Sequence, residues 1–502
     1  MPTAHITIDP AAVVGSVNRR LFGSFVEHLG RSVYDGIYEP GHPTADAGGF
    51  RGDVVELVKE LGVSAIRYPG GNFVSGYRWE DGVGPRAERP RRLDLAWHST
   101  ETNEVGLHEF SEWLELVGSE LMYAVNLGTR GVQQALDVLE YANIRSGTRL
   151  SDWRVANGHT EPFRIGMWCL GNEMDGPWQL GHGTADEYGA LAAKTARAMR
   201  QVDPGIELVV CGSSSAQMPT FGAWERTVLE HSYDEVDYIS CHAYYEPADG
   251  DVDSFLASAA NMDGFIETVV AVADEVKAAK GSDKTINISF DEWNVWYMER
   301  YLADDKITDI EEWPVAPRLL EDSYSVLDAV VFGSLLISLL KHADRVTSAS
   351  LAQLVNVIAP IMTEPGGPAW RQTTFFPFAE TSRLATGEAL ALTLRSDTHV
   401  TDQYGEVNLV DAVATHDHGT TAVFLVNRST TEPAEVTIDV AALGVVSVVS
   451  ARTLTDADSS AANTLEHPDR VGLVDNESAV VADGSMTITL PPVSWTAISL
   501  AG

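Results

Sequence analysis

The chain has 502 residues, of which 44% are hydrophobic, 21% charged and 8% aromatic, a composition typical of folded globular proteins. It carries 72 acidic and 34 basic residues, a formal net charge of -38 at pH 7, which would repel nucleic-acid phosphates and anionic membranes. We therefore expect no nucleic-acid and no membrane partner, and we interpret the excess acid as a solvated surface. The length exceeds that of one usual hydrophobic core and predicts a large domain joined to a smaller one.

The N-terminal sequence, the longest apolar run and the cysteines together indicate in which cell compartment the protein is expected. The N-terminal stretch MPTAHITIDP has no basic segment followed by an apolar one, so no secretory signal is visible. The longest strongly apolar run, near Ala329 to Leu340, is shorter than the ~20 residues that cross a bilayer. Cys169, Cys211 and Cys241 lie in separate apolar runs without CxxC spacing, which favours reduced thiols over disulfides or a three-thiolate metal site. These features predict a cytoplasmic protein.

Short apolar runs alternate with longer segments of helical period from about residue 20 to about residue 360. Each run has the length of a buried strand, and most of the runs end in polar residues. In chain order the runs are LFGSFVEHL from Leu21, SAIRYPGG from Ser64, LMYAVNLG from Leu121, RIGMWCLGNE from Arg164, IELVVCGSSS from Ile206, VDYISCHAYY from Val236, INISFDEWN from Ile286 and SASLAQLVN from Ser348.

Helical segments separate these runs. Thr184 and Glu187 have the spacing of a capping box at the start of one helix, and the last helix is predicted over residues 321–341. Strand followed by helix, repeated eight times, predicts an α/β protein whose large domain is a (β/α)8 TIM barrel over residues 19–375.

Beyond about residue 380 the pattern changes to short alternating strands with turn residues between them. This pattern predicts a C-terminal antiparallel β-sandwich domain over residues 376–502. The N-terminal residues 1–18, which contain AHITID, are predicted to add a strand to it. The C-terminal runs are TAVFLVN from Thr421, EVTIDV from Glu435, VVSVVSART from residue 445, SMTITL from Ser485 and WTAISL from Trp495.

Polar residues at the ends of the barrel runs are the candidates for chemistry, because active sites of such barrels lie at the carboxyl ends of the strands. The sequence contains no HExxH, no GxxxxGK, no GxGxxG after a strand and no GxSxG, which disfavours metalloprotease, nucleotide-binding and serine-hydrolase chemistry. Paired carboxylates with amides indicate a glycosidase instead, and we expect neither a cofactor nor a metal. The strand-end residues are Glu27 and His28, Arg67 and Asn72, Asn172 and Glu173, His242 and Tyr244, Glu292 and Asn294, and Gln353 and Asn356.

Glu173 and Glu292 end the fourth and seventh predicted strands, where they would face each other across the barrel mouth. Carboxyl groups about 5 to 5.5 Å apart would give a retaining mechanism, and a gap of about 6.5 to 9.5 Å an inverting one. Which glutamate donates the proton stays open here, because the environment sets each pKa; Arg67 or Tyr244 is placed to hold one carboxylate ionised. Asp291 competes with Glu292, but adjacent strand residues are expected to point to opposite sides.

Several longer motifs resemble one known family. They are FGSFVEHLGRSVYDGIYEP, RYPGGNF, WCLGNEMDGPWQLGH, SCHAYY and FDEWNVWY. This set is similar in order and spacing to the α-L-arabinofuranosidases of glycoside hydrolase family 51, and the similarity runs through the predicted barrel. The resemblance implies a retaining, exo-acting enzyme that removes terminal non-reducing α-L-arabinofuranosyl groups from arabino-oligosaccharides and arabinoxylo-oligosaccharides. It also implies a homo-oligomer, often a hexamer.

The resemblance further implies roles for individual residues. Glu173 matches the acid/base of the family, and Glu292 matches its nucleophile. Trp97 and Trp296 resemble aromatic groups around the leaving sugar, although Trp296 and Trp178 also fit as core aromatics. His242 fits best as a supporting residue outside the catalytic pair. The residues that match groups binding the furanose ring or holding the nucleophile are Glu27, Arg67, Asn72, Asn172, Tyr244 and Gln353.

Two other functions stay open at this point. A barrel glycosidase of another specificity, such as an endo-acting β-glucanase or xylanase, would have a long open cleft instead of a closed pocket for one pentose. A non-catalytic carbohydrate-binding or scaffold protein would bind glycan through the β-domain, but the two glutamates argue against an inert barrel. The motifs do not choose among α-1,2, α-1,3 and α-1,5 linkages.

Overall fold

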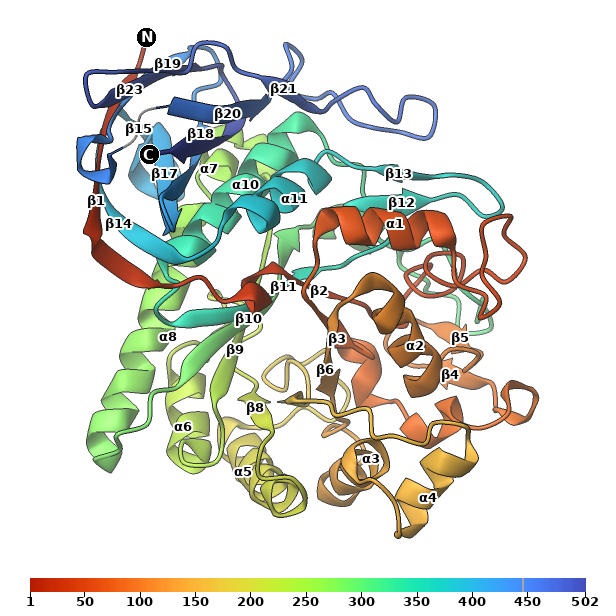
Figure 1. The fold of residues 1–502 in the computed structure, drawn as a ribbon. Helices are drawn as coiled ribbons and strands as arrows, with labels where there is room; N and C mark the ends of the chain where they lie inside the picture. The colour runs from red at the N-terminus through yellow and green to blue at the C-terminus, as the bar shows by residue number, and fades with distance from the viewer. Residues whose placement is uncertain (445–446) are drawn as a thin grey trace.

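Eight parallel strands close into a barrel (Figure 1). The structure is a computed structural model that describes residues 1–444 and 447–502. Each barrel strand coincides with one of the eight apolar runs, so the predicted (β/α)8 barrel is confirmed. The barrel strands follow one another as β2 (Gly23–Phe25), β3 (Ala65–Tyr68), β6 (Glu120–Ala124), β7 (Met167–Leu170), β8 (Glu207–Val210), β9 (Tyr238–Tyr245), β10 (Asn287–Val295) and β11 (Val346–Ala352), which pairs with β2.

Helices between the strands cover the outside of the barrel. The predicted capping box between Thr184 and Glu187 begins α5 (Ala185–Val202). α10 (Val326–Lys341) begins later than predicted, because Ser325 caps its first turn. The other helices are α1 (Gly52–Leu61), α2 (Leu107–Val117), α3 (Val132–Asn143), α4 (Arg149–Ala156), α6 (Ala223–Ser232), α7 (Val252–Leu256), α8 (Ala259–Lys280), α9 (Met298–Arg300) and α11 (Phe375–Leu384).

A ten-stranded sheet joins the two ends of the chain. β1 (Thr3–Ser16) pairs antiparallel with β14 (Glu388–Ser396) and parallel with β19 (Ala434–Asp439). The strand predicted from residue 445 is present from Ser447 onward, and residues 445–446 lie outside the described residues. The remaining strands of the sheet are β17 (Val410–Asp417), β18 (Thr420–Asn427), β20 (Ser447–Leu454), β21 (Leu473–Asp475), β22 (Val480–Ala482), β23 (Ser485–Leu490) and β24 (Ser494–Ala501).

Two apolar clusters form the interior. The larger one fills the barrel and the space between the barrel and its helices. Ile6, Leu425 and Ile488 come from distant strands of the ten-stranded sheet and share the second cluster, so the sheet folds over on itself around a core, as in a β-sandwich. α11 crosses the predicted limit between residues 375 and 376, and the domain limits stay predictions.

α10 connects the barrel to the sheet (Figure 1). It is buried along nearly its whole length, and it contacts β10 and β11 as well as β17, β18 and β24. Lys341 Nζ, at its end, lies 2.5 Å from Asp411 Oδ1 in β17, and Arg428 Nη2 lies 3.0 Å from Asp411 Oδ2. Burial would raise the pKa of Asp411, but the two cations outweigh it and lower that pKa well below its ordinary value.

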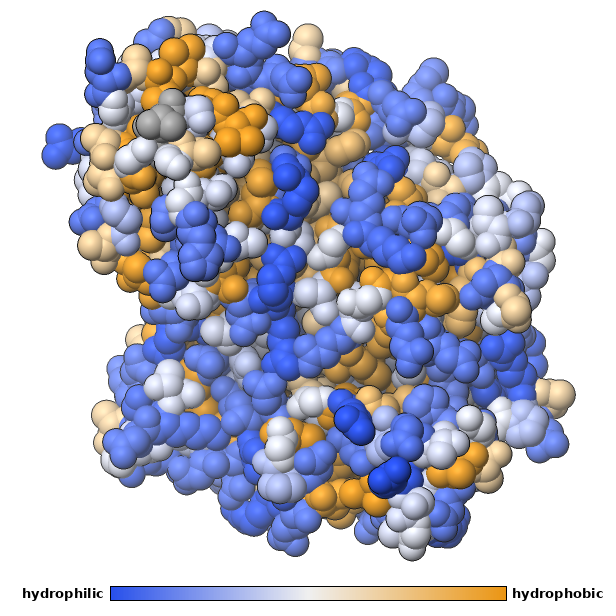
Figure 2. Space-filling view, viewed as in Figure 1, coloured by the Kyte–Doolittle hydropathy of each residue, from blue (hydrophilic) through white to orange (hydrophobic). Residues whose placement is uncertain are grey.

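Hydrophilic side chains predominate on the face shown in Figure 2, and apolar ones occur there in smaller groups. The three cysteines are buried and free, as predicted. Across the part of the chain that the structure describes, no helix is both long enough and apolar enough to span a bilayer.

Candidate active site

The two predicted catalytic glutamates meet at the mouth of the barrel. Glu173 follows β7, and Glu292 lies in β10. A carboxyl oxygen of one lies within 4.8 Å of a carboxyl oxygen of the other, and a ring nitrogen of His242 in β9 lies within the same distance of both. Glu173 is 8% exposed and Glu292 is 5% exposed. Two acids and a histidine therefore share one buried site.

Unusual backbone conformations bring these side chains together. The chain turns sharply after β7, with Gly171 at φ 92° and Glu173 at φ 43°. A glutamate in the left-handed region is strained, which requires the surrounding structure to hold it there, and such strain is frequent at functional sites. On another side of the site, a Cβ added to Gly71 would lie only 3.1 Å from Glu292 Oε1. The PGG turn thus lets the backbone approach the carboxylate closely.

Glu292 accepts hydrogen bonds from a guanidinium and a phenol. Arg67 Nη1 lies 2.7 Å from Oε1, and Tyr244 Oη lies 2.7 Å from Oε2. The other terminal nitrogen of Arg67, Nη2, donates to Asn172 Oδ1 at 2.6 Å, which fixes the guanidinium plane. These contacts favour an ionised carboxylate in one orientation, as a nucleophile requires.

The protonation of Glu292 is linked to that of Glu173. Burial raises the pKa of Glu292 above its ordinary value of 4.5; His242 and Arg67 oppose this, and the charge of Glu173 adds to it. Because two close carboxylates repel each other, a charged Glu173 disfavours the ionised form of Glu292. When Glu173 is protonated, the repulsion is absent, and the donors around Glu292 favour its ionised form.

Glu173 has a different set of contacts. Trp178 Nε1 lies 2.7 Å from Oε2, and His242 Nδ1 lies 2.9 Å from Oε1. Trp178 is 53% exposed, so it lies at the entrance of the site and its interpretation as a core aromatic is wrong. An acid beside the entrance is placed to transfer a proton to a departing group.

His242 contacts three carboxylates, a much closer involvement than its predicted supporting role. Nδ1 lies 2.9 Å from Glu173 Oε1 and 3.4 Å from Glu292 Oε2, and Nε2 lies 2.9 Å from Asp291 Oδ1. Burial would lower the pKa of His242, but the charge of Glu292 and the hydrogen bonds to Asp291 and Glu173 raise it to about 10. The ring is therefore an imidazolium at neutral pH, and both nitrogens donate.

An irregularity in β10 explains why Asp291 and Glu292 reach the same ring. The pairing of β10 with β9 is interrupted between Ser289 and Glu292. A bulge of this kind breaks the alternation of side chains along a strand. The expectation that Asp291 and Glu292 point to opposite sides does not hold here, because both contact His242.

Glu173, His242 and Glu292 are also residue types that bind metal ions, and in the described residues they form a group of close ligand atoms. A histidine must be deprotonated to bind a metal. His242 instead has a pKa of about 10, and both of its nitrogens face carboxylates. The donor set therefore fits a hydrogen-bonded ion cluster better than a metal centre.

Glu27, which follows β2, is surrounded by donors. Its Oε1 accepts from the backbone N–H of Phe73 at 2.8 Å and from Trp97 Nε1 at 2.9 Å. Its Oε2 accepts from Gln353 Nε2 at 3.3 Å. Burial outweighs these contacts and raises the pKa of Glu27 to about 8. Glu27 therefore keeps its proton to a higher pH than an ordinary glutamate.

The remaining predicted residues lie beside this set. Asn172 Nδ2 lies 3.3 Å from Asn72 Oδ1 and 3.3 Å from Gln179 Oε1. Trp296 is half-buried and packs edge-on against Tyr244, with ring centroids 5.1 Å apart. The structure thus brings the predicted residues to one mouth. Gln179 was not predicted, although it lies within the quoted motif WCLGNEMDGPWQLGH, which was the available signal.

A (β/α)8 barrel with two close, buried glutamates at its strand ends, surrounded by amides, an arginine and aromatic rings, defines the class of barrel glycoside hydrolases. Family models narrow the class. The Alpha-L-arabinofuranosidase 1 domain matches residues 57–262, and the Alpha-L-arabinofuranosidase C-terminal domain matches residues 291–494.

Curated relatives and solved structures agree with these models. An intracellular exo-α-(1→5)-L-arabinofuranosidase of Streptomyces lividans is 61% identical over 100% of this chain and 76% of its own. An exo-α-(1→6)-L-arabinofuranosidase of Bifidobacterium longum is 61% identical over 99% of this chain and 97% of its own. The structure of a family 51 α-L-arabinofuranosidase from Bifidobacterium longum matches with a TM-score of 0.95 and 51% identity over 100% of both chains. This chain belongs to the α-L-arabinofuranosidases of glycoside hydrolase family 51.

Proposed function

We propose that the protein is a retaining exo-α-L-arabinofuranosidase, which removes terminal non-reducing α-L-arabinofuranosyl groups from arabino-oligosaccharides and arabinoxylo-oligosaccharides. One observation carries the mechanism: oxygens of Glu173 and Glu292 lie within 4.8 Å of each other. Retaining glycosidases hold their carboxyl groups about 5 to 5.5 Å apart, whereas inverting ones need about 6.5 to 9.5 Å for an intervening water. Membership of glycoside hydrolase family 51 supports L-arabinofuranose as the sugar that the enzyme removes.

The reaction has two steps. Glu292 attacks the anomeric carbon while Glu173 protonates the departing oxygen, so that a covalent glycosyl-enzyme forms and the leaving group is released. Glu173, now a carboxylate, then takes a proton from a water molecule, which attacks the same carbon and releases arabinose. Arg67 and Tyr244 orient Glu292 in both steps through their 2.7 Å contacts.

The polar residues around the pair bind the furanose. A small sugar with several hydroxyl groups needs donors and acceptors at fixed positions. Glu27 offers carboxyl oxygens to the sugar hydroxyl groups beside Gln353. Asn172 precedes the acid/base and is placed for the 2-hydroxyl, whose hydrogen bonds strengthen in the oxocarbenium-like transition state.

The relatives also bear on location and linkage. Those from Streptomyces lividans and Bacillus subtilis are named intracellular, which supports the predicted cytoplasmic location. The two relatives that are 61% identical are named for α-1,5 and α-1,6 linkages, so overall identity does not choose a linkage. The homo-oligomer implied by the family resemblance stays a prediction, which size-exclusion chromatography with light scattering tests.

The first experiment compares release of L-arabinose from an aryl α-L-arabinofuranoside by the unmodified protein and by Glu292→Ala. We expect release by the unmodified protein and a loss of about 10⁴-fold or more in the variant. NMR of the first-formed sugar should show the α anomer if the mechanism is retaining. Cleavage of aryl xylosides or glucosides alone would overturn the sugar assignment, and silence on every glycoside would favour a binding protein.

A further inference from the structure

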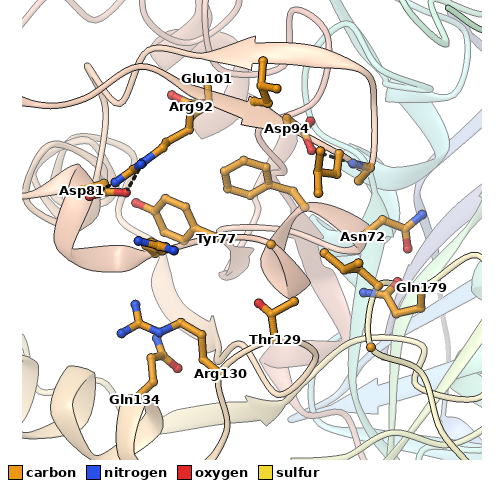
Figure 3. Close-up of a pocket in the computed structure, with 18 of the residues that line it drawn as sticks. Asn72, Tyr77, Asp81, Arg92, Asp94, Glu101, Thr129, Arg130, Gln134 and Gln179 are labelled. Carbon is orange, nitrogen blue, oxygen red and sulfur yellow. Dashed lines mark hydrogen bonds and ion pairs between the residues drawn. The ribbon is translucent and has the colours of Figure 1, made fainter. Parts of the chain in front are cut away.

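Asp291 directly precedes the proposed nucleophile Glu292 in β10 and is only 1% exposed. A cavity of about 1060 Å³ opens beside the site, and Asn72 and Gln179 lie on its wall (Figure 3). Asp291 is not among the described residues that line this cavity. A substrate that reaches the site from solvent meets almost none of the surface of Asp291, so this residue can act on the reaction only through other side chains.

The irregularity of β10 is centred on Asp291. The pairing with β9 is interrupted between Ser289 and Glu292, and the pairing with β11 is interrupted between Phe290 and Trp293. Within the described chain, Asp291 is the one β10 residue that has no register partner in either neighbouring strand. Bulges redirect a side chain and are frequent next to active sites. The irregularity therefore sets where the Asp291 carboxylate points.

The two oxygens of Asp291 face the two cations of the site. Oδ1 accepts a hydrogen bond from His242 Nε2 at 2.9 Å, and Oδ2 lies 3.9 Å from Arg67 Nε, an ion-pair distance. Arg67 Nε has no hydrogen-bond partner among residues 1–444 and 447–502. Burial would lower the pKa of Arg67, but the charge of Asp291 contributes most to raising it well above its ordinary value. One buried carboxylate thus faces both cations that contact the catalytic glutamates.

The charges of the groups in contact with His242 and Arg67 balance when Asp291 is counted. In the first step of the proposed reaction Glu292 is ionised and Glu173 is protonated. Asp291 then supplies the second negative charge, against the positive charges of His242 and Arg67. In the second step Glu292 is bound to the sugar and Glu173 is ionised, which again gives two charges of each sign. Without Asp291 one buried positive charge would be unpaired in both steps, which favours loss of the His242 proton.

We propose that Asp291 is a positioning residue for the reaction, whose carboxylate keeps the His242 ring charged and oriented between the two catalytic glutamates and attracts the guanidinium of Arg67. A buried carboxylate on one nitrogen of a histidine ring stabilises the imidazolium and fixes the orientation of the ring. The other ring nitrogen then faces Glu173 and Glu292. The inference deepens the proposed function and rests on it, because the negative charge moves between these two glutamates only in that reaction.

The thiols near Asp291 do not change this balance. Cys169 Sγ lies 3.9 Å from Asp291 Oδ2, and Cys211 and Cys241 lie at β8 and in β9. Burial raises the pKa of all three thiols, so they are uncharged at neutral pH. The acidic groups that act on the His242 ring are Glu292, Asp291, Glu173 and Asp175, and Arg67 faces the first two of them.

The charge of the His242 ring can be measured directly by NMR of protein labelled with ¹⁵N in its histidine rings. The signals of His242 are identified by their absence from the spectrum of His242→Asn. We expect protons on both ring nitrogens from about pH 6 to about pH 8 in the unmodified protein, because the pKa of His242 is about 10. A ring that is neutral at pH 7 would overturn the inference without any variant of Asp291.

Asp291→Asn keeps the shape of the side chain and an acceptor for His242 but removes the charge. His242 should then lose its proton at a pH lower by about one unit or more. With an aryl arabinofuranoside, kcat should fall about 10- to 100-fold while KM stays within about 3-fold, because Asp291 does not touch the sugar. An unchanged titration of His242, or an unchanged kcat, would overturn the inference.

Asp411→Asn is the matched control for the loss of a buried carboxylate. Asp411 also faces two cations, Lys341 and Arg428, but it lies in the ten-stranded sheet and not in the barrel. This control should leave both kcat and the titration of His242 unchanged. Equal effects of Asp411→Asn and Asp291→Asn on these two quantities would show a general loss of structure and would contradict the role of Asp291.

A double variant tests whether Asp291 acts through His242. In a His242→Asn background, Asp291→Asn should lower kcat by no more than about 3-fold, because residues that act as a unit are not additive. Losses that multiply in full would overturn the route through the ring. Inactivity of the unmodified protein on every arabinoside would overturn the proposed function and the catalytic role together, whereas the titration of His242 would still show whether Asp291 keeps the ring charged.

Discussion

His242 Nδ1 lies 2.9 Å from Glu173 Oε1, so an imidazolium contacts the proposed acid/base directly. The same nitrogen lies 3.4 Å from Glu292 Oε2. The negative charge moves between these two glutamates during the reaction, since each is ionised in one of its steps. A cation that faces both carboxylates stabilises either charge distribution, which makes His242 a positioning residue for both steps.

Replacing His242 with Asn should lower kcat/KM about 10²-fold. It should also move the acidic limb of the pH profile upward by about one pH unit. The sign follows from charge: a neighbouring cation lowers the pKa of Glu292, so its loss raises that pKa further above 4.5 and inactivates the nucleophile at higher pH. His231→Asn, at an exposed contact with Asp186, is the control. Coincident acidic limbs in His242→Asn and the unmodified enzyme would refute this role.

Glu173→Ala should affect substrates according to their leaving groups. Loss of the general acid should lower kcat about 10³-fold for arabino-oligosaccharides, while an aryl substrate with an acidic phenol should retain its first step. Added azide should restore turnover of that aryl substrate by replacing water in the second step. Glu230→Ala, on the exposed face of α6, serves as the control. Equal losses on both substrate types would reject Glu173 as the acid/base.

The raised pKa of Glu27 can be tested by comparing how pH affects the stability of the unmodified protein and of Glu27→Gln. The carboxyl group has a pKa of about 8 in the folded protein and an ordinary value of 4.5, so the folded state binds the proton more tightly. The contribution of the protonated Glu27 carboxyl group to stability is fully present below pH 4.5 and is lost as pH rises through about 8. Between pH 4.5 and about 8, the free energy of unfolding of the unmodified protein, measured in urea, should fall by about 1.4 kcal/mol per pH unit relative to that of Glu27→Gln. Parallel pH dependences would contradict the assignment.

Asp411→Asn should weaken the attachment of α10 to the sheet. The variant leaves Lys341 and Arg428 without their carboxylate and should lower the free energy of unfolding by about 3 kcal/mol or more at pH 7. Because the folded pKa of Asp411 is depressed, its contribution is present above the ordinary value of 3.8 and declines as pH falls below it. The difference from the unmodified protein should therefore shrink in acid. Asp475→Asn, on an exposed strand, should show no such difference.

The barrel was predictable because its strands are uninterrupted apolar runs, and buried parallel strands require such runs. Polar residues at the ends of these runs mark the mouth, so the sequence alone predicts that Glu173, Glu292 and Arg67 lie there. The pattern carries this information because strand direction alone places every carboxyl end at one face of the barrel.

The relations that the sequence did not reveal depend on irregular geometry. Asp291 reaches His242 through an interrupted strand register, and a period of two assumes a regular strand. Trp178 looked like any apolar aromatic, because its exposure depends on the path of the loop after Glu173. The cavity beside the site is built by loop residues such as Arg78 and Asp81, whose positions follow from tertiary contacts and not from local periodicity.

The place of β1 in the sheet has a consequence for synthesis on the ribosome. β1 is made before β14, its antiparallel partner, which follows about 370 residues later and at about 5–20 residues per second takes roughly 20 to 75 s more to be made. During that time Ile6 and Ile8, buried in the finished sheet, belong to a strand whose partners do not yet exist. The barrel can form in this interval, whereas the sheet cannot. β1 is therefore made long before it can pair with β14.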